Sequence, residues 1–399
     1  MNQSNLANPS VSIVERHFRH GLIGFYMMAA FLYWISLYLY VPTLPTYVQT
    51  KTENLAQMGA ILSMYGLWQG VIRLPLGILV DWLGRRKPFI IAGLVLAGMG
   101  AWSMGRANGP GGLFIGRSIT GLAAAAWVPL LVAFSGLFPV NEAVRATALL
   151  TFANTSGRIL ATSATGALNN IGGFTLPFLL ASGVAGLAIL FILPTPEEVR
   201  PRLQPSMRGI ARLVTRRDVL LPSLLAAVSQ YANWATTFGF TPILAGQLGG
   251  SDVTQSMLVT VNLLVVILTN LFAARLARHF GARPLILFSF WMLVAGMGIT
   301  TMATSLPMLF AAQLFIGISQ GINFPVLMGL SIRFVAESGR NTAMGLHQSV
   351  YAAGMFAGPW VSGILAQAVG LRPMLFISTL GILVLGWMGG SRLDQDSHG

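Results

Sequence analysis

The sequence contains no cysteine and very little charge. Without cysteine there can be no disulfide, no thiol redox chemistry and no thiolate metal ligand. Only 9% of the 399 residues are charged and 54% are hydrophobic, whereas a soluble protein of this length needs a charged surface. The net charge of +13 would suggest nucleic-acid binding only on a basic face of a soluble fold. Here the basic residues lie between apolar stretches, which favours a membrane protein and argues against a nucleic-acid partner.

Acidic residues are the scarcest charged group: there are 11, and none lies in the middle of an apolar stretch. A phosphate-binding P-loop is also missing, so ATP-driven chemistry by this chain alone is not supported. The segment GISQG (317–321) matches the nucleophile-elbow pattern, but it lies in an apolar stretch, where its glycines fit close helix packing. No acid or second histidine lies at ligand spacing from His347. We therefore expect no enzyme activity, no cofactor and no metal site.

Twelve apolar stretches follow one another along the chain, and each approaches the length of about 20 residues that a membrane-spanning helix needs. Lipid cannot hydrogen-bond the backbone, so each span must be helical. The predicted spans are 21–48, 57–80, 88–106, 112–138, 146–171, 174–193, 220–246, 255–277, 284–304, 307–334, 342–368 and 373–390. The first has no small-residue cleavage site after it, so we interpret it as a retained span. The predicted fold class is an all-α membrane protein with 12 transmembrane helices.

The basic residues predict the orientation of the chain. Most of the 24 lysines and arginines lie in the two terminal segments and the even-numbered loops. The positive-inside rule then places both termini in the cytoplasm, in a multi-pass protein of a bacterial cytoplasmic (inner) membrane. The longest loop, 194–219, is rich in proline and arginine. Its basic residues either lie along anionic lipid headgroups or simply follow the same rule.

The two halves of the sequence repeat each other. YWISLYLYVP (33–42) aligns with NWATTFGFTP (233–242), and LFIGRSITG (113–121) aligns with LFAAQLFIG (309–317). Parallel halves of six spans predict two pseudo-symmetric six-helix bundles with a cavity between them. We divide the chain into an N-terminal bundle (1–193), a cytoplasmic linker (194–219) and a C-terminal bundle (220–399). Such symmetry supports a transporter but does not name a cargo.

Three short segments carry a family resemblance. GILVDWLGRR (77–86), between predicted spans two and three, resembles motif A of the major facilitator superfamily. RSITG (117–121) resembles motif B, and VPTLP (41–45) resembles the end of span one in the twelve-span drug and metabolite efflux branch. One departure is in span five, where NTSGRILATSATG (154–166) replaces the Gly-Pro-rich motif C. The resemblance covers essentially the whole chain, and it implies the major facilitator fold and secondary transport by alternating access.

The same resemblance implies a gate at motif A. Asp81 would meet an arginine, or the positive N-terminus of a helix in the other half, when the cytoplasmic side is closed. The start of span eleven is the candidate partner, and Arg85 and Arg145 are nearer alternatives. A fixed pair at a helix end, with no switching role, is the other interpretation. The gating candidates are Gly77, Asp81, Gly84, Arg85, Arg86, Arg145 and Arg340.

Four basic residues lie well inside the predicted spans, away from their ends: Arg73, Arg117, Arg158 and His347. Such groups cost about 2.5–3.5 kcal/mol or more in lipid, so they mark functional positions by default. Since no acid accompanies them, the field of the cavity should be positive. Arg117 either sets this field and assists proton movement or braces span four. Asn154, one turn before Arg158, forms with it a donor pair suited to a carboxylate or phosphate, the alternative being an arginine bonded to backbone.

His347 and Arg117 are the candidates for proton coupling. His347, with Tyr351 one turn further on, is the only group inside the bundle that titrates near neutral pH. A simply hydrogen-bonded histidine is the alternative. For Arg73 we favour a structural pairing.

Aromatic and amide residues complete the predicted cavity, where they either bind cargo or hold helices together. Tyr33 belongs to a stripe with Tyr26, Tyr40 and Tyr47 at heptad spacing, for which packing is the alternative explanation. The substrate-binding candidates are Tyr33, Trp34, Arg117, Trp127, Asn154, Arg158, Gln230, Asn233, Trp234, Gln320, Asn323, His347 and Tyr351.

These features lead to one expected function and two alternatives. We expect a secondary transporter that exports a small amphipathic molecule, anionic or zwitterionic, with proton coupling left open. The alternatives are uptake of an organic anion and a membrane receptor or scaffold that transports nothing. The expected partners are the small-molecule substrate, membrane lipids and, if transport is coupled, protons. We expect a monomer.

Overall fold

The computed structural model describes residues 9–139, 142–197, 215–335 and 340–393. All the regular elements within these ranges are helices. The linker predicted at 194–219 falls largely outside them.

The N-terminal half contains six rods of membrane-spanning length. They are α1 (Pro9–Tyr38) continued by η1 (Val41–Thr43) and α2 (Leu44–Gln49), α3 (Leu55–Leu83), α4 (Lys87–Gly105), α5 (Pro110–Ala124) continued by α6 (Trp127–Ser135), α7 (Ala143–Gly172) and α8 (Thr175–Ile192). The first rod is interrupted at Val41–Thr43, where Pro42 and then Pro45 lack the amide hydrogen that an unbroken helix would use.

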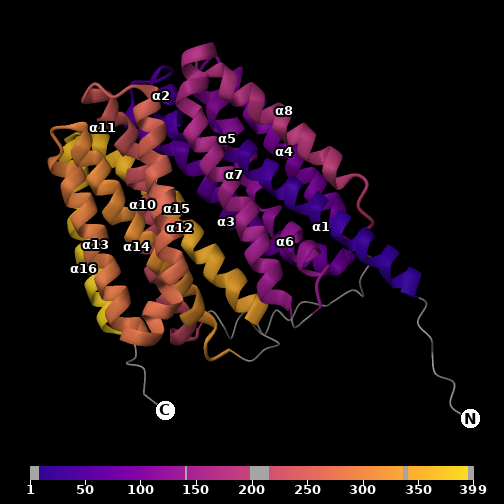
Figure 1. The fold of residues 1–399 in the computed structure, drawn as a ribbon. Helices are drawn as coiled ribbons and strands as arrows, with labels where there is room; N and C mark the ends of the chain where they lie inside the picture. Colours follow the sequence, from indigo (N-terminus) through magenta and orange to yellow (C-terminus); the bar gives the residue numbers. More distant parts are fainter. Residues whose placement is uncertain (1–8, 140–141, 198–214, 336–339, 394–399) are drawn as a thin grey trace, which may run out of the picture.

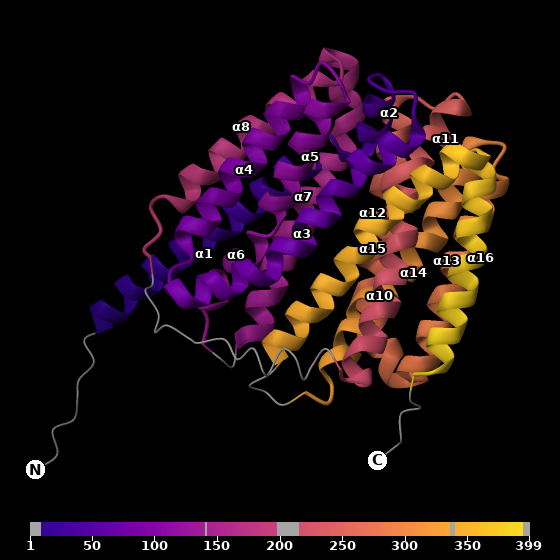
Figure 2. The same ribbon diagram turned by 180° about the vertical axis from the view of Figure 1, so that it is seen from behind.

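The C-terminal half repeats this arrangement. Its rods are α10 (Arg217–Ala235) continued by the π-helical turn η3 (Thr236–Phe240) and α11 (Thr241–Gln247), α12 (Asp252–Phe280), α13 (Ala282–Met302), α14 (Leu306–Ile332), α15 (Arg340–Val369) and α16 (Leu371–Ser391). Figures 1 and 2 show the halves side by side, with the start of α1 and the end of α16 at the same end of the molecule. We call this the termini end, and we call the end that holds α2 and α11 the far end.

The predicted fold class, 12 membrane-spanning rods in two pseudo-symmetric six-helix bundles, is confirmed. Within the described residues, nine helical units are long and apolar enough to cross a membrane by length and composition alone. The three rods that begin with α3, α7 and α10 are not among them, and each of these carries polar side chains at the interface between the halves. Large apolar side chains such as Leu190 and Trp387 are exposed on the outer helices, as expected for contact with lipid.

Glycine contacts show how closely the halves repeat. A Cβ added to Gly100 would lie 2.9 Å from the carbonyl oxygen of Gly116, and one added to Gly296 would lie 2.9 Å from that of Ala312. Gly157 faces Phe31 and Trp34 in the same way as Gly358 faces Tyr231 and Trp234. These matches make Arg158 of α7 the positional equivalent of Pro359 in α15. In the first match Gly116 is equivalent to Ala312. The residues that follow them, Arg117 of α5 and Gln313 of α14, therefore also correspond.

Close backbone contact within the C-terminal half depends on Gly354. A Cβ at this position of α15 would overlap the carbonyl oxygen of Ala227 in α10. We expect Gly354→Ala to destabilise the protein by about 1–3 kcal/mol, because backbone cannot rotate away from the added methyl group. Thermal unfolding of the purified protein measures this loss. Gly345→Ala on the same helix, where nothing lies within 4 Å, is the control, and an equal loss there would contradict the explanation.

The two halves pack against each other from the far end to the middle of the molecule. Along α3, Gly66 and Gly70 meet α15, and a Cβ at Gly66 would lie 2.6 Å from the backbone of Met355. Figure 2 shows α3 and α15 diverging toward the termini end, where a Cβ added to Gly77 or Gly345 would meet nothing within 4 Å. Helices α3 and α15 therefore touch over their far-end portions and separate toward the termini end.

Polar contacts close the far end as well. Asn169 of α7 donates to Asp252 of α12 at 2.8 Å, and Thr260 of α12 donates to Thr162 of α7 at 2.9 Å. Thr46 of α2 donates to Gln255 of α12 at 3.0 Å. The structure is thus closed at the far end, which we call the far-end-closed state.

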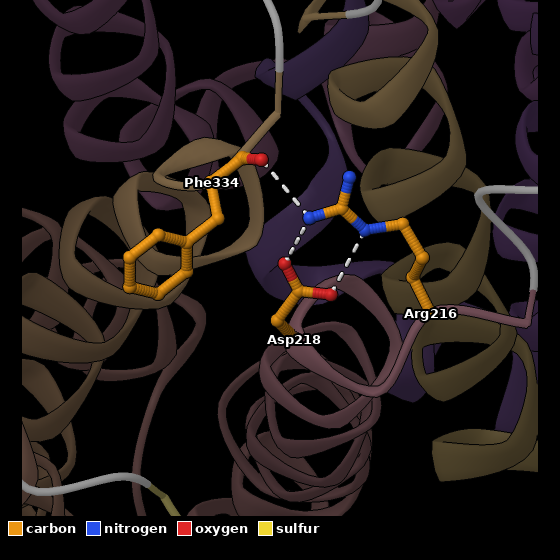
Figure 3. A network of polar contacts seen from close by, with 3 residues as sticks. All are labelled: Arg216, Asp218 and Phe334. Atoms are coloured by element: carbon orange, nitrogen blue, oxygen red, sulfur yellow. Dashed lines mark hydrogen bonds and ion pairs between the residues drawn. The ribbon is translucent and has the colours of Figure 1, made fainter.

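A local ion pair fixes the entry into the C-terminal half (Figure 3). Arg216 holds the Asp218 carboxylate through two N–H groups and also donates to the carbonyl oxygen of Phe334 at 2.9 Å, so the start of α10 is tied to the segment after α14. The hydrogen bond from Arg216 holds the pKa of Asp218 below its ordinary value. The stabilisation from this pair is therefore present at neutral pH and is lost as the pH falls through that lowered pKa.

Candidate functional site

A chain of aromatic rings crosses the interface between the halves. On the N-terminal side, Trp127 of α6 contacts Trp34 of α1 with ring centres 5.3 Å apart, and Trp34 contacts Tyr38 at 5.6 Å. Tyr38 then meets Phe238 of η3 edge to face at 6.2 Å. Phe238 contacts Trp234 at 5.0 Å. Trp234 at the end of α10 and Phe238 in the π-helical turn thus both lie at the interface, and π-helical turns are frequent at functional sites.

Arg117 lies at one end of this chain. Its guanidinium carbon is 4.4 Å from the centre of the Tyr65 ring and 5.9 Å from that of Trp234. Tyr65 of α3 stacks on Trp234 across the interface, with ring centres 5.3 Å apart. Arg117 is only 2% exposed, and its Nε and Nη1 atoms have no hydrogen-bond partner. A buried guanidinium is therefore stabilised by π faces rather than by a carboxylate.

Arg158 lies beside the part of the chain that belongs to the N-terminal half, in the same kind of environment. Its guanidinium carbon is 4.4 Å from the centre of the Tyr38 ring and 5.7 Å from that of Trp34. The side chain is half-buried, and its Nε atom has no hydrogen-bond partner. Asn154, one turn earlier on α7, has a buried Oδ1 atom that is likewise unpartnered. Asn154 and Arg158 lie one turn apart on α7, and their action as a donor pair for a ligand stays a prediction.

Unpartnered polar atoms gather along the same interface. Buried groups normally find a partner, so each exception needs an explanation. Besides the two arginines and Asn154, the unpartnered atoms on interface helices include the indole nitrogen of Trp34, Oε1 of Gln69 and Oδ1 of Asn233. Neither Arg117 nor Arg158 takes part in any ion pair within the described part of the chain. The arginine N–H groups and the Trp34 indole nitrogen are donors suited to a negatively charged group, whereas the three amide oxygens are acceptors.

Arg73 links the halves where α3 and α15 begin to separate. Its Nη1 atom donates to the hydroxyl oxygen of Tyr351 at 2.8 Å, and the side chain is 6% exposed. The expected structural pairing of Arg73 is therefore with a tyrosine of the other half. Tyr351 in turn lies edge to face with His347, with ring centres 6.1 Å apart. The cluster thus joins Arg73 of α3 to Tyr351 and His347 of α15.

His347 is completely buried, and its hydrogen bond fixes its tautomer. Ser223 Oγ donates to the carbonyl oxygen of Val219 at 2.6 Å and lies 3.1 Å from Nδ1 of His347. A hydroxyl has one hydrogen, so Ser223 must accept from a protonated Nδ1. The lone pair is then on Nε2, which has no partner. His347 is thus hydrogen-bonded and still offers a free proton acceptor.

Three other predicted substrate residues form hydrogen bonds inside one half. Gln320 donates to the carbonyl oxygen of Ser229 at 2.9 Å, and Asn323 donates to Ser229 and Ser319 at 3.1 Å. Tyr33 donates to the carbonyl oxygen of Ala123 at 2.7 Å. These contacts hold neighbouring helices together. Gln230 is half-buried on α10, with no contact that brings it to the arginines.

The motif A residues lie at the termini end. Gly84 ends α3 in the left-handed conformation, with φ of 67°, and its N–H bonds the carbonyl oxygen of Val80. Arg85 is exposed and Arg86 is half-buried. Arg145 pairs locally with Glu142 at 3.2 Å. Asp81 and Arg340 belong to α3 and α15, but their side chains lie outside the described part of the structure, so the latch stays a prediction.

Comparisons with known proteins identify the family. The sequence profile described as Major Facilitator Superfamily matches residues 26–229 and again 223–393. The chain belongs to this superfamily. An uncharacterised transporter of the same type from Methanocaldococcus jannaschii is 21% identical over 92% of this chain and 98% of its own. The multidrug resistance protein MdtH of Aeromonas salmonicida is 25% identical over 82% of this chain and 84% of its own.

Solved structures agree in fold. A bacterial homologue of the lysosomal transporter Spinster, in an inward-facing conformation, has a TM-score of 0.76 at 14% identity and covers 94% of this chain and 97% of its own. The nucleoside transporter NupG has a TM-score of 0.75 at 16% identity and covers 94% of this chain and 100% of its own. This member of the Major Facilitator Superfamily is thus a multi-pass membrane transporter rather than an enzyme.

Proposed function

We propose that this transporter exports a small amphipathic organic anion or zwitterion across the bacterial inner membrane by alternating access. The observation that carries the proposal is the pair of arginines, Arg117 and Arg158, which are held against aromatic rings at the interface with no carboxylate partner among the described residues. An anion supplies the missing partner, and the rings accept an apolar body. The multidrug resistance protein among the relatives favours export.

The termini end is proposed to face the cytoplasm. The far-end-closed state then corresponds to an arrangement in which the site communicates with the cytoplasm. Rocking of the halves would separate α3 from α15 and α7 from α12 at the far end and close the termini end. His347 and Arg117 are the proposed proton-coupling residues, since Nε2 of His347 is free to accept a proton. The two bundles (1–193 and 220–399), joined by 194–219, are the proposed moving bodies, and the active unit is proposed to be a monomer.

Flux through proteoliposomes tests the function. The probes are 3-phenylpropanoate and 3-cyclohexylpropanoate as anions and 3-phenylpropylammonium as a cation of matched size. We expect both anions to cross faster than in protein-free vesicles, and the cation to show no acceleration, because the guanidinium groups repel it. Transport of the cation alone would contradict the proposal, and absence of any flux would favour a receptor or scaffold.

A pH gradient separates export from uptake. In exchange with protons the anion accumulates on the acidic side, and in symport with protons it accumulates on the alkaline side. Weak acids also follow pH gradients passively, so each flux is compared with that in protein-free vesicles. A protein-dependent flux that ignores the gradient would show that protons are not coupled.

A further inference from the structure

We propose that the substrate is a planar aromatic carboxylate, with its ring among the aromatic side chains of the interface and its carboxylate on Arg158. This inference rests on the proposed function, because it names the substrate class of the same site. It makes two separate claims, one about the charged group and one about the ring. Each claim has its own observations and its own failing result.

The charge claim starts from the way Arg158 is held. Tyr38 and Trp34 lie against its guanidinium group at 4.4 Å and 5.7 Å. All five N–H groups of a guanidinium lie in its plane, so a ring over its face leaves donors free at its edge. The Nε atom has no partner but is buried, so a ligand would reach the other N–H groups of this half-buried side chain. A carboxylate can therefore bind Arg158 without displacing the rings.

Arg158 is the better anchor of the two arginines because it is reachable. Arg117 is 2% exposed beneath Tyr65 and Trp234, whereas Arg158 and Asn154 are both half-buried. Both lie on the termini side of Thr162, where the far-end contact between α7 and α12 begins. The indole nitrogen of Trp34 is buried without a partner beside the same guanidinium, so it would donate to a second oxygen of a ligand whose entry separates the rings.

The site suits one carboxylate better than a phosphate. Proteins bind phosphates with several cations, or with a row of free backbone N–H groups at a helix N-terminus. Arg158 lies in the interior of α7, where backbone N–H groups are already used in the helix. The second guanidinium, Arg117, contacts a different set of rings, Tyr65 and Trp234. A single negative charge is therefore the best match.

The ring claim rests on the aromatic pairs that join the two halves. Tyr65 of α3 stacks on Trp234 of α10 with an angle of 20° between the rings, and Tyr38 of α1 meets Phe238 of η3 at 80°. These four side chains are 3–6% exposed. Each of them is therefore in contact with an aromatic ring of the other half rather than with solvent. When the halves rock apart, both pairs must separate. A flat aromatic ring can replace the lost stacked and edge contacts in the same geometry, whereas a saturated ring has no flat π face.

Three ligands that differ by one feature each test both claims on the purified full-length protein. They are 3-phenylpropanoate, 3-cyclohexylpropanoate with a saturated ring, and 3-phenylpropanamide with no charge. Affinity is measured by isothermal titration and by the rise in thermal unfolding temperature. We expect 3-phenylpropanoate to bind at least about tenfold more tightly than either of the others, in line with the cost of losing one charged or aromatic contact.

Variants of the cage assign each preference to its residue. Arg158→Gln is expected to reduce the affinity for 3-phenylpropanoate to that for the amide. Tyr38→Leu is expected to remove the preference for phenyl over cyclohexyl. Arg278→Ala, an exposed arginine at the end of α12, is the matched control and should change neither preference. The unfolding temperature of each variant without ligand shows whether it is folded.

Each claim is contradicted by a different experimental result. Equal affinity for the phenyl and cyclohexyl acids would overturn the ring claim, while the proposed export of an organic anion would stand. Equal affinity for the acid and the amide would overturn the charge claim. Lack of binding by all three would overturn the whole inference, and flux of other anions would then still support the proposed function. Binding of 3-phenylpropylammonium in place of the acids would overturn both this inference and the proposed export of an organic anion.

Discussion

Replacing Gly59 by valine is expected to hold the far end of the transporter open. A Cβ at this position of α3 would overlap the carbonyl oxygen of Pro359 and lie 2.9 Å from the Cα atom of Gly363. Both are backbone atoms of α15, so neither can rotate away. The strain, about 3 kcal/mol for a side chain larger than methyl, is relieved only by separating α3 from α15. Since these helices belong to different halves, the variant should fold but lose the far-end-closed state by roughly a hundredfold.

The absence of native cysteine makes this measurable. A single cysteine in place of Thr260, which is buried between α12 and α7 at the far end, reports on closure. Its maleimide labelling should accelerate strongly in the Gly59→Val protein, and substrate flux should fall in parallel. Gly183→Val is the matched control, because Gly183 is exposed on α8 with nothing within 4 Å. Unchanged labelling with normal flux would show that α3 and α15 need not pack at Gly59.

The second large effect is expected for Arg158→Ala. Removing the guanidinium takes away a charge-assisted contact of about 1.5–3 kcal/mol, which corresponds to a loss of roughly ten- to hundredfold in the transport of organic anions. Arg158→Lys should restore only part of this activity, because an ammonium group cannot present a planar edge to a carboxylate while it lies over the Tyr38 ring. Initial rates in proteoliposomes measure both variants. Full activity of the alanine variant would exclude Arg158 from the site.

Asn154→Asp gives a sharper test of the same contact. A carboxylate at this position, one turn from Arg158 on α7, would pair with the guanidinium and take the place of a negatively charged ligand. Anion transport should fall as far as in Arg158→Ala, although no positive charge has been removed. Asn154→Leu is nearly as large and uncharged, and should retain more activity. Equal loss in the leucine and aspartate variants would show that packing, rather than charge, explains the effect.

The fold was predictable because the bilayer constrains it so strongly. Twelve apolar stretches and two aligned halves are compatible with few other folds. The π-helical turn at Thr236–Phe240 falls within the predicted span 220–246. The contact partners were not predictable. The sequence indicated that Gly317 and Gly321 pack closely, but only the structure shows that they meet α12, at Val265 and Val266. The spacing of glycines indicates that another helix packs closely there, but it does not identify that helix.

The arginines of the candidate site and three rings of its aromatic chain, Trp34, Trp127 and Trp234, were candidates from the sequence. Arg117 and Arg158 stand out in the sequence because charge is so rare within the spans. Tyr65 and Tyr38, which lie against them, were missed. The heptad stripe on span one directed attention to Tyr33 and Tyr40, but Tyr33 bonds the carbonyl oxygen of Ala123 and Tyr40 packs on Phe178, both inside the N-terminal half. A regular spacing identifies a buried face, but burial within one half and burial between halves look the same in a sequence.

Among the described residues, the arginines buried or half-buried in the interior, Arg73, Arg117 and Arg158, all belong to the N-terminal half. Arg117 corresponds to Gln313 and Arg158 to Pro359, and among the described residues no arginine or lysine of the C-terminal half takes an equivalent interior place. Membrane voltage therefore pulls on one bundle and leaves its twin nearly untouched, at about 2.3 kcal/mol for each charge moved through 100 mV. An empty carrier feels this force in full, whereas a bound anion cancels part of it. The membrane potential would then act mainly on the step in which the empty transporter returns to its starting conformation.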